Sequence, residues 1–149
     1  MKTSPLLRSW LALPLSLLFA ACSGETVDDL IADRIEGSTL TYKSCGSVDL
    51  TLEQCSATPA EPPAELRCFT DGLDQCQPVH VTITQHTVEG DPIVTGYVVV
   101  PEEGSCSATV ITDTREDQFG AQEITTERCT TFDVVESCVG FAVSDCKPL

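Results

Sequence analysis

The sequence predicts an α+β domain, stabilised by disulfides, in which one helix packs on an antiparallel meander of four to five strands. Three observations predict it: nine cysteines in 149 residues, one amphipathic helical segment, and a following series of Thr- and Val-rich segments separated by turns. Cysteines at this density are typical of exported proteins, since disulfides form and persist in oxidising compartments. The length suits one small domain preceded by a leader.

The first 21 residues have the order of an export signal. Lys2 and Arg8 precede the apolar run WLALPLSLLFAA at 10–21. As a helix, this run of 12 residues would span about 18 Å, short of the ~30 Å hydrocarbon core of a bilayer. We therefore expect a cleaved signal peptide over 1–21 and not a membrane-spanning anchor.

The stretch Phe19-Ala20-Ala21-Cys22 resembles the lipobox of bacterial lipoproteins, with Phe19 where leucine is usual. The resemblance implies that Cys22 is lipidated on its sulfur, becomes the new N-terminus and is acylated, so that the membrane is a partner. Ser23 after it implies the outer membrane. The alternative is an ordinary signal peptide cut near Ala21, which would leave Cys22 as an unpaired thiol.

The cysteine count agrees with a lipidated Cys22. Eight cysteines remain, an even number that permits four bridges with none left over: Cys45, Cys55, Cys68, Cys76, Cys106, Cys129, Cys138 and Cys146. The chain then divides into a signal peptide (1–21), a lipidated N-terminus followed by an acidic tether or short helix (22–37), and a disulfide-rich domain (38–149).

The elements of the mature chain follow from capping, periodicity and turns. Thr26 with Asp29 three residues later forms a weak capping box for a helix ending near Gly37, and an acidic linker is the alternative. Short strands are expected around a turn at 45–47, and Leu66, Phe69, Leu73 and Cys76 form the apolar stripe of a helix over 63–76. The remaining expected strands cover 39–42, 48–52, 80–88, 93–100, 106–112, 123–132 and 139–143.

These elements restrict the disulfide pairing. Cys68 and Cys76 on one helix would be about 12 Å apart, beyond the ~7 Å limit for a disulfide. We expect both to bond to Cys45 and Cys55, in either combination. A hairpin centred between residues 117 and 118 would place Cys106 opposite Cys129, which leaves Cys138 to pair with Cys146.

The remaining residues predict a binding or structural role in the cell envelope and no enzyme. The formal charge of −15 argues against nucleic-acid binding, which needs a basic face. Catalytic, phosphate-binding and dinucleotide-binding motifs are absent from the sequence, and we expect no cofactor and no metal. The acidic turn 113–117 has Arg115 where a calcium site would need an oxygen, so it is interpreted as a solvated loop. The expected contact loops for an envelope protein partner contain Glu89, Gly90, Asp91, Asp113, Arg115 and Asp117.

A helix followed by a four-stranded meander is similar to the cystatin family in element order. That resemblance implies, as the alternative function, inhibition of papain-like cysteine proteases through hairpin loops. The family's Gln-x-Val-x-Gly motif is one residue too long in this chain, at Gln85 to Gly90, and the second loop at 114–120 lacks the Pro-Trp pair.

Overall fold

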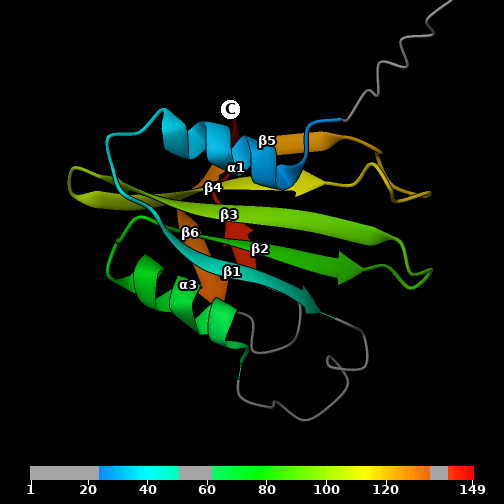
Figure 1. Ribbon diagram of the computed structural model, residues 1–149, viewed down its shortest axis with the longest axis horizontal. Helices are drawn as coiled ribbons and strands as arrows, with labels where there is room; N and C mark the ends of the chain where they lie inside the picture. The colour runs from blue at the N-terminus through cyan, green and yellow to red at the C-terminus, as the bar shows by residue number, and fades with distance from the viewer. Residues whose placement is uncertain (1–23, 51–61, 135–140) are drawn as a thin grey trace, which may run out of the picture.

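The computed structural model describes residues 24–50, 62–134 and 141–149. It shows an α+β fold in three layers, with a central six-stranded sheet between α1 (Val27–Glu36) on one face and α3 (Ala64–Asp74) on the other (Figure 1). The predicted fold class is confirmed. Besides the expected helix α3, the structure has a helix within 22–37, one of the two alternatives for that segment, and it adds the strand β8 at the far edge of the sheet.

The sheet has the order β1-β2-β3-β4-β5-β8. Strands β2 to β5 form the predicted antiparallel meander, and the short β8 pairs with β5. Strand β1 runs parallel to β2. Helix α3 lies between them in the chain and brings the chain back to the end of the sheet at which β1 began, so that β2 runs in the same direction. The strand bounds are β1 Lys43–Leu50, β2 Val79–His86, β3 Pro92–Glu102, β4 Ser105–Asp113, β5 Ile124–Cys129 and β8 Lys147–Pro148.

Helix α1 confirms the helical interpretation of 22–37. The Thr26 side chain accepts a hydrogen bond from the Asp29 backbone while the Asp29 carboxylate accepts from the Thr26 backbone, so the predicted capping box is complete. Val27 and Ile31 are buried against the sheet, where they pack near Val98. The apolar face of the helix therefore covers one side of the meander.

Gly96 on β3 sets how closely α1 approaches the sheet. A Cβ atom at this position would lie 2.7 Å from both Ile31 Cδ1 and Val27 Cγ1. We expect Gly96→Ala to destabilise the domain by about 1–3 kcal/mol, because the helix must move outward. Urea unfolding measures the loss. Gly37→Ala is the matched control, since its Cβ would meet nothing closer than 3.7 Å, and an equal loss in both variants would contradict the interpretation.

On the opposite face, α3 and the hairpin of β6 (Thr131–Val134) and β7 (Phe141–Ser144) cover the larger of two hydrophobic clusters, which we call the main core. Its buried members are Leu50, Phe69, Val79, Val81, Ile83, Tyr97, Val99, Val110, Cys129 and Phe141. Phe69 is fully buried, and its ring centroid lies 4.8 Å from that of Phe141 and 5.8 Å from that of Tyr97. Burial raises the pKa of Tyr97 to about 12. The helix thus carries the central side chain of an uncharged aromatic cluster.

Three of the expected strands differ from those in the structure. The sequence predicts strands at 39–42 and 48–52 on either side of a turn, but residues 43–50 form one strand with a register shift between Ser44 and Ser47. Gly46, with φ of 92°, takes the left-handed conformation at this irregularity. The expected strand at 123–132 is divided between β5 and β6, which belong to different sheets.

The structure contains the disulfides Cys45–Cys68 and Cys129–Cys146, and these indicate an extracytoplasmic protein. Cys68 bonds back to the N-terminal segment, as expected. The predicted pairs Cys106–Cys129 and Cys138–Cys146 are wrong. Thr114 donates its backbone N–H to the carbonyl of Glu123, so the centre of the β4–β5 hairpin lies one residue beyond the predicted position between 117 and 118. Cys129 is therefore opposite Ala108 and not Cys106.

The expected bond from Cys76 to Cys45 or Cys55 is also not found, because both Cys76 and Cys106 are free thiols in the structure. Cys22, Cys55 and Cys138 lie outside the described residues.

Candidate functional site

One end of the sheet gathers the loops that the sequence proposed as contact surfaces. We call it the loop end and define it as residues 24–26, 87–91 and 113–123. The β2–β3 turn, the β4–β5 loop and the start of α1 all lie at this end, on the right of Figure 1, opposite the β3–β4 turn. Segments that are far apart in the sequence therefore form one surface.

A pair of hydrogen bonds joins the two hairpin loops. The Asp91 carboxylate accepts from the backbone N–H of Gln118 at 3.1 Å and from the Gln118 side-chain amide at 3.3 Å. The β2–β3 turn is itself closed by a bond from the Thr87 N–H to the Asp91 carbonyl, and Gly90, with φ of 94°, supplies the left-handed residue in it. Of the predicted contact residues, Asp91 thus positions the neighbouring loop.

Arg115 connects the β4–β5 loop to the start of α1. Its Nε donates to Asp113 Oδ1 at 2.9 Å and its Nη2 to Asp113 Oδ2 at 2.7 Å. Nη2 also donates to the carbonyl of Glu25 at 2.7 Å. The hydrogen bonds from Arg115 lower the pKa of Asp113. The Asp113 carboxylate is therefore paired with the Arg115 guanidinium.

The outer surface of the loop end combines acidic groups with two exposed apolar side chains. Val88 is 84% exposed and Phe119 is 78% exposed. The three segments contain seven carboxylates and one cation, Arg115. The seven are Glu25, Glu89, Asp91, Asp113, Glu116, Asp117 and Glu123. Contact surfaces commonly combine exposed apolar side chains with a polar rim, and Val88 and Phe119 are the large apolar side chains that the loop end offers.

Sequence reasoning named the two loops but not the residues that hold them together. Gln118 and the Glu25 carbonyl were not predicted, because a neutral amide and a backbone oxygen carry no sequence signal. Phe119 could have been found, since it is a large apolar residue inside the polar stretch TREDQFG.

His86 links the loop end to the edge strand β1. Its Nδ1 lies 3.2 Å from the carbonyl of Gly90 and its Nε2 lies 3.0 Å from Asp49 Oδ1. Only the imidazolium can donate to both acceptors at once, and the bonds with Gly90 and Asp49 raise the pKa of His86. His80, on the same strand, is half-buried, and its burial lowers its pKa.

This contact predicts a pH dependence of stability. A raised folded-state pKa means that His86 contributes its full stabilisation below its unfolded-state pKa of about 6.5. That contribution is lost as the pH rises through the folded-state value. We expect the difference in Tm between the wild type and His86→Gln to be largest near pH 5 and to shrink toward pH 8.5. The opposite trend of His80 is common to both proteins and cancels. A difference that does not change with pH would contradict the assignment.

Two other features of the described residues do not form a chemical site. Glu127, Cys129 and Cys146 have ligand atoms within 4.8 Å of one another, but the two sulfurs are bonded to each other and do not offer thiolates to a metal. A depression of about 580 Å³ near the C-terminus has one acidic side chain, Asp145, beside Arg128 and Lys147. It lacks the carboxylate pair that glycoside hydrolysis requires.

Within residues 24–50, 62–134 and 141–149, no helix has the length and apolar character needed to cross a bilayer. Comparison of the whole chain with protein-family models, with curated proteins and with solved structures gave no match.

Proposed function

We propose that the chain is a lipid-anchored protein of the bacterial cell envelope, attached through Cys22 to the outer membrane, that acts by binding or by structural placement. The observation that carries this proposal is the leader, in which a charged segment, an apolar run and Phe19-Ala20-Ala21-Cys22 follow one another in order. The disulfides support an extracytoplasmic location. Several buried acyl chains, at about 0.8 kcal/mol per methylene, would make the attachment durable.

Metabolic labelling with a palmitate analogue tests the anchor. We expect the wild-type protein to carry the label and to sediment with membranes. Cys22→Ser should remove both properties, because the thioether cannot form. Ser23→Ala, one residue away, is the matched control and should keep them. An unlabelled wild-type protein, or equal labelling of Cys22→Ser, would refute the anchor.

The anchor would fix the orientation of the domain. Cys22 and Gly24 are two positions apart in the chain, a span of at most about 7 Å. Gly24 lies against Arg115, since a Cβ on this glycine would be 2.9 Å from Arg115 Nη1. The loop end would therefore face the bilayer, with Phe119 and Val88 at the headgroups. A protein partner would approach from the opposite end, at the β3–β4 turn.

A single tryptophan can report this orientation. The sequence contains one tryptophan, Trp10, within the segment that cleavage would remove. Phe119→Trp would then give a mature protein with one fluorophore at the loop end, and Glu103→Trp one at the β3–β4 turn. With lipidated protein in phosphatidylcholine vesicles that carry brominated acyl chains, we expect quenching at position 119 and none at 103. The reverse result would reject the orientation while leaving the anchor intact.

Protease inhibition is the second candidate, because Asp91 and Gln118 hold the two hairpin loops side by side. An inhibitory surface must be free to enter an enzyme cleft, whereas an anchor at Cys22 would turn the same surface toward the membrane. Titration of the unlipidated mature domain against a papain-like protease decides the point. Full protease activity at micromolar domain concentrations would remove this candidate.

A further inference from the structure

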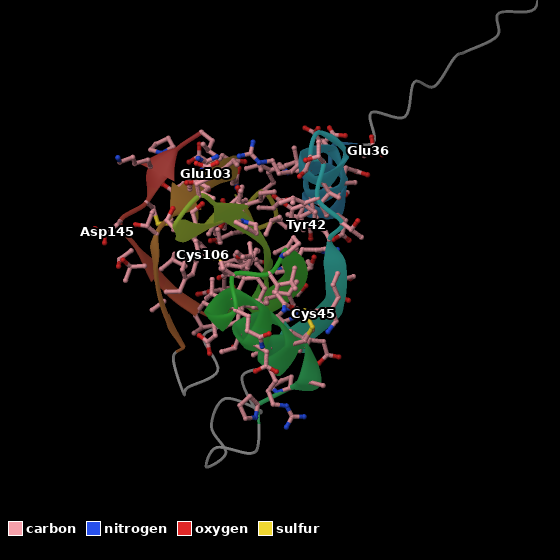
Figure 2. All side chains as sticks on the ribbon, turned by 90° about the vertical axis from the view of Figure 1, so that its left-hand side faces the viewer. Glu36, Tyr42, Cys45, Glu103, Cys106 and Asp145 are labelled. Atoms are coloured by element: carbon pink, nitrogen blue, oxygen red, sulfur yellow. A yellow bond between two sulfur atoms is a disulfide. The ribbon has the colours of Figure 1, made fainter. Side chains whose placement is uncertain are left out.

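The two free thiols of the described residues are neighbours in the fold, although they are 30 positions apart in the sequence. Cys76 follows the C-terminus of α3, and Cys106 is near the start of β4. The Cys76 sulfur donates to the carbonyl of Ser105 at 3.4 Å, and the Cys106 sulfur donates to the carbonyl of Leu73 at 3.9 Å. Each thiol thus contacts the backbone next to the other cysteine, and the Cys76 thiol is close enough to Cys106 to influence its pKa. Figure 2 labels Cys106, which lies at the end of α3.

The end of α3 fixes the position of Cys76. Its backbone N–H donates to Leu73 and that of Gln77 to Gly72, which closes the last turn of the helix. Cys76 has φ of 50°, a left-handed conformation that favours glycine. The chain therefore has a side chain at a position where glycine would be less strained, and the sulfur of that side chain meets a second sulfur.

The surroundings of Cys106 do not suit a nucleophile or a metal ligand. In the folded domain, burial raises the pKa of its thiol to about 12, and the neighbouring Cys76 thiol adds to the effect. Thiolates are the reactive and metal-binding form, so in the folded domain this sulfur is not suited to act as a catalytic nucleophile or a metal ligand at neutral pH. Cys106 also packs against the main core beside Leu73, as expected of a structural cysteine.

We propose that Cys76 and Cys106 form a third disulfide of the domain, which joins the C-terminus of α3 to β4. The oxidant is the disulfide form of a dithiol oxidoreductase. The Cys76 thiolate attacks that disulfide and forms a mixed disulfide with one of its sulfurs. Before the domain closes around it and burial raises its pKa, the Cys106 thiolate then attacks Cys76 Sγ and displaces the enzyme thiolate. Two electrons and the two thiol protons end on the oxidoreductase, which leaves as a dithiol.

Mapping of disulfide-linked peptides tests the bond in protein that has been exported with its own leader and purified without reductant. After alkylation of free thiols, cleavage on the carboxyl side of Asp and Glu yields the peptides 75–89 and 104–113, with one cysteine each. We expect these two peptides to be linked, and reduction to separate them. Alkylation of both cysteines, or a link from either one to a different cysteine, would overturn the proposal.

The stability of alanine variants gives an independent readout. A bond needs both sulfurs, so Cys76→Ala, Cys106→Ala and the double variant should lower Tm by the same amount, on the order of 10 °C. Two unbonded thiols would instead give separate effects that add in the double variant. A Tm loss in the double variant that equals the sum of the two single losses would therefore contradict the bond.

Discussion

Replacing Phe69 with alanine is expected to cost about 3–5 kcal/mol of the free energy of unfolding, because it empties the centre of the main core. Phe69 is fully buried and lies between Tyr97 and Phe141. Its removal would leave a cavity at the point where α3, the sheet and the β6–β7 hairpin meet. The rigid rings on either side cannot close that cavity. Urea unfolding monitored by circular dichroism measures the loss.

Phe119→Ala is the matched control, because it deletes the same atoms from a side chain that is 78% exposed. We expect this variant to unfold within about 0.5 kcal/mol of the wild type. Similar losses at the two positions would mean that Phe69 is not the centre of the core. A large loss at Phe119 alone would mean that the loop end is packed against something in the free protein.

The double variant Cys129→Ala/Cys146→Ala is expected to lose about 3 kcal/mol, since the bond closes a short loop in the unfolded chain. The two cysteines are 17 positions apart, and Cys129 is fully buried in the main core. The bond also holds the C-terminal segment, whose strand β8 has only two residues, against β5. We therefore expect the Leu149 amide, which donates to the Thr126 carbonyl of β5, to lose its protection from hydrogen exchange before the amides of the other strands do.

Reduction supplies the control for this prediction. In dithiothreitol the wild type loses the same bond, so the stability gap between the two proteins should close. A gap that persists in reductant would assign the loss to packing of the sulfur atoms. Peptide mapping of the wild type should show Cys129 linked to Cys146. A link from Cys129 to Cys106, which the sequence alone suggested, would contradict the strand register.

Local signals predicted the elements well. The Thr26–Asp29 capping box and the apolar residues that follow it define α1, and the stripe through Leu66, Phe69 and Leu73 predicts a helix at 63–76 where the structure has Ala64–Asp74. The first three meander strands, β2 to β4, also agree, because they are separated by turns such as Glu89-Gly90-Asp91-Pro92. Capping and turn formation depend on neighbouring residues, which the sequence displays directly.

Relations between distant segments could not be predicted in the same way. The predicted centre of the β4–β5 hairpin was wrong by one residue. This error shifts the residue of β4 opposite each residue of β5 by two positions, so that Cys129 faces Ala108 and not Cys106. Both registers keep the same face of β5 toward the core, so the hydrophobic pattern does not distinguish them. The loop end likewise depends on Asp91, Gln118 and Arg115, whose partners are distant in the chain.

The parallel placement of β1 has a kinetic consequence. Strands β2 to β5 pair with their chain neighbours, so their contacts close short loops at small entropic cost. Strand β1 pairs with a segment about 36 positions away, as from Lys43 to Val79, and α3 must form between them. Since such long-range pairing is slow, we expect the meander to assemble first and β1 to add to its edge last.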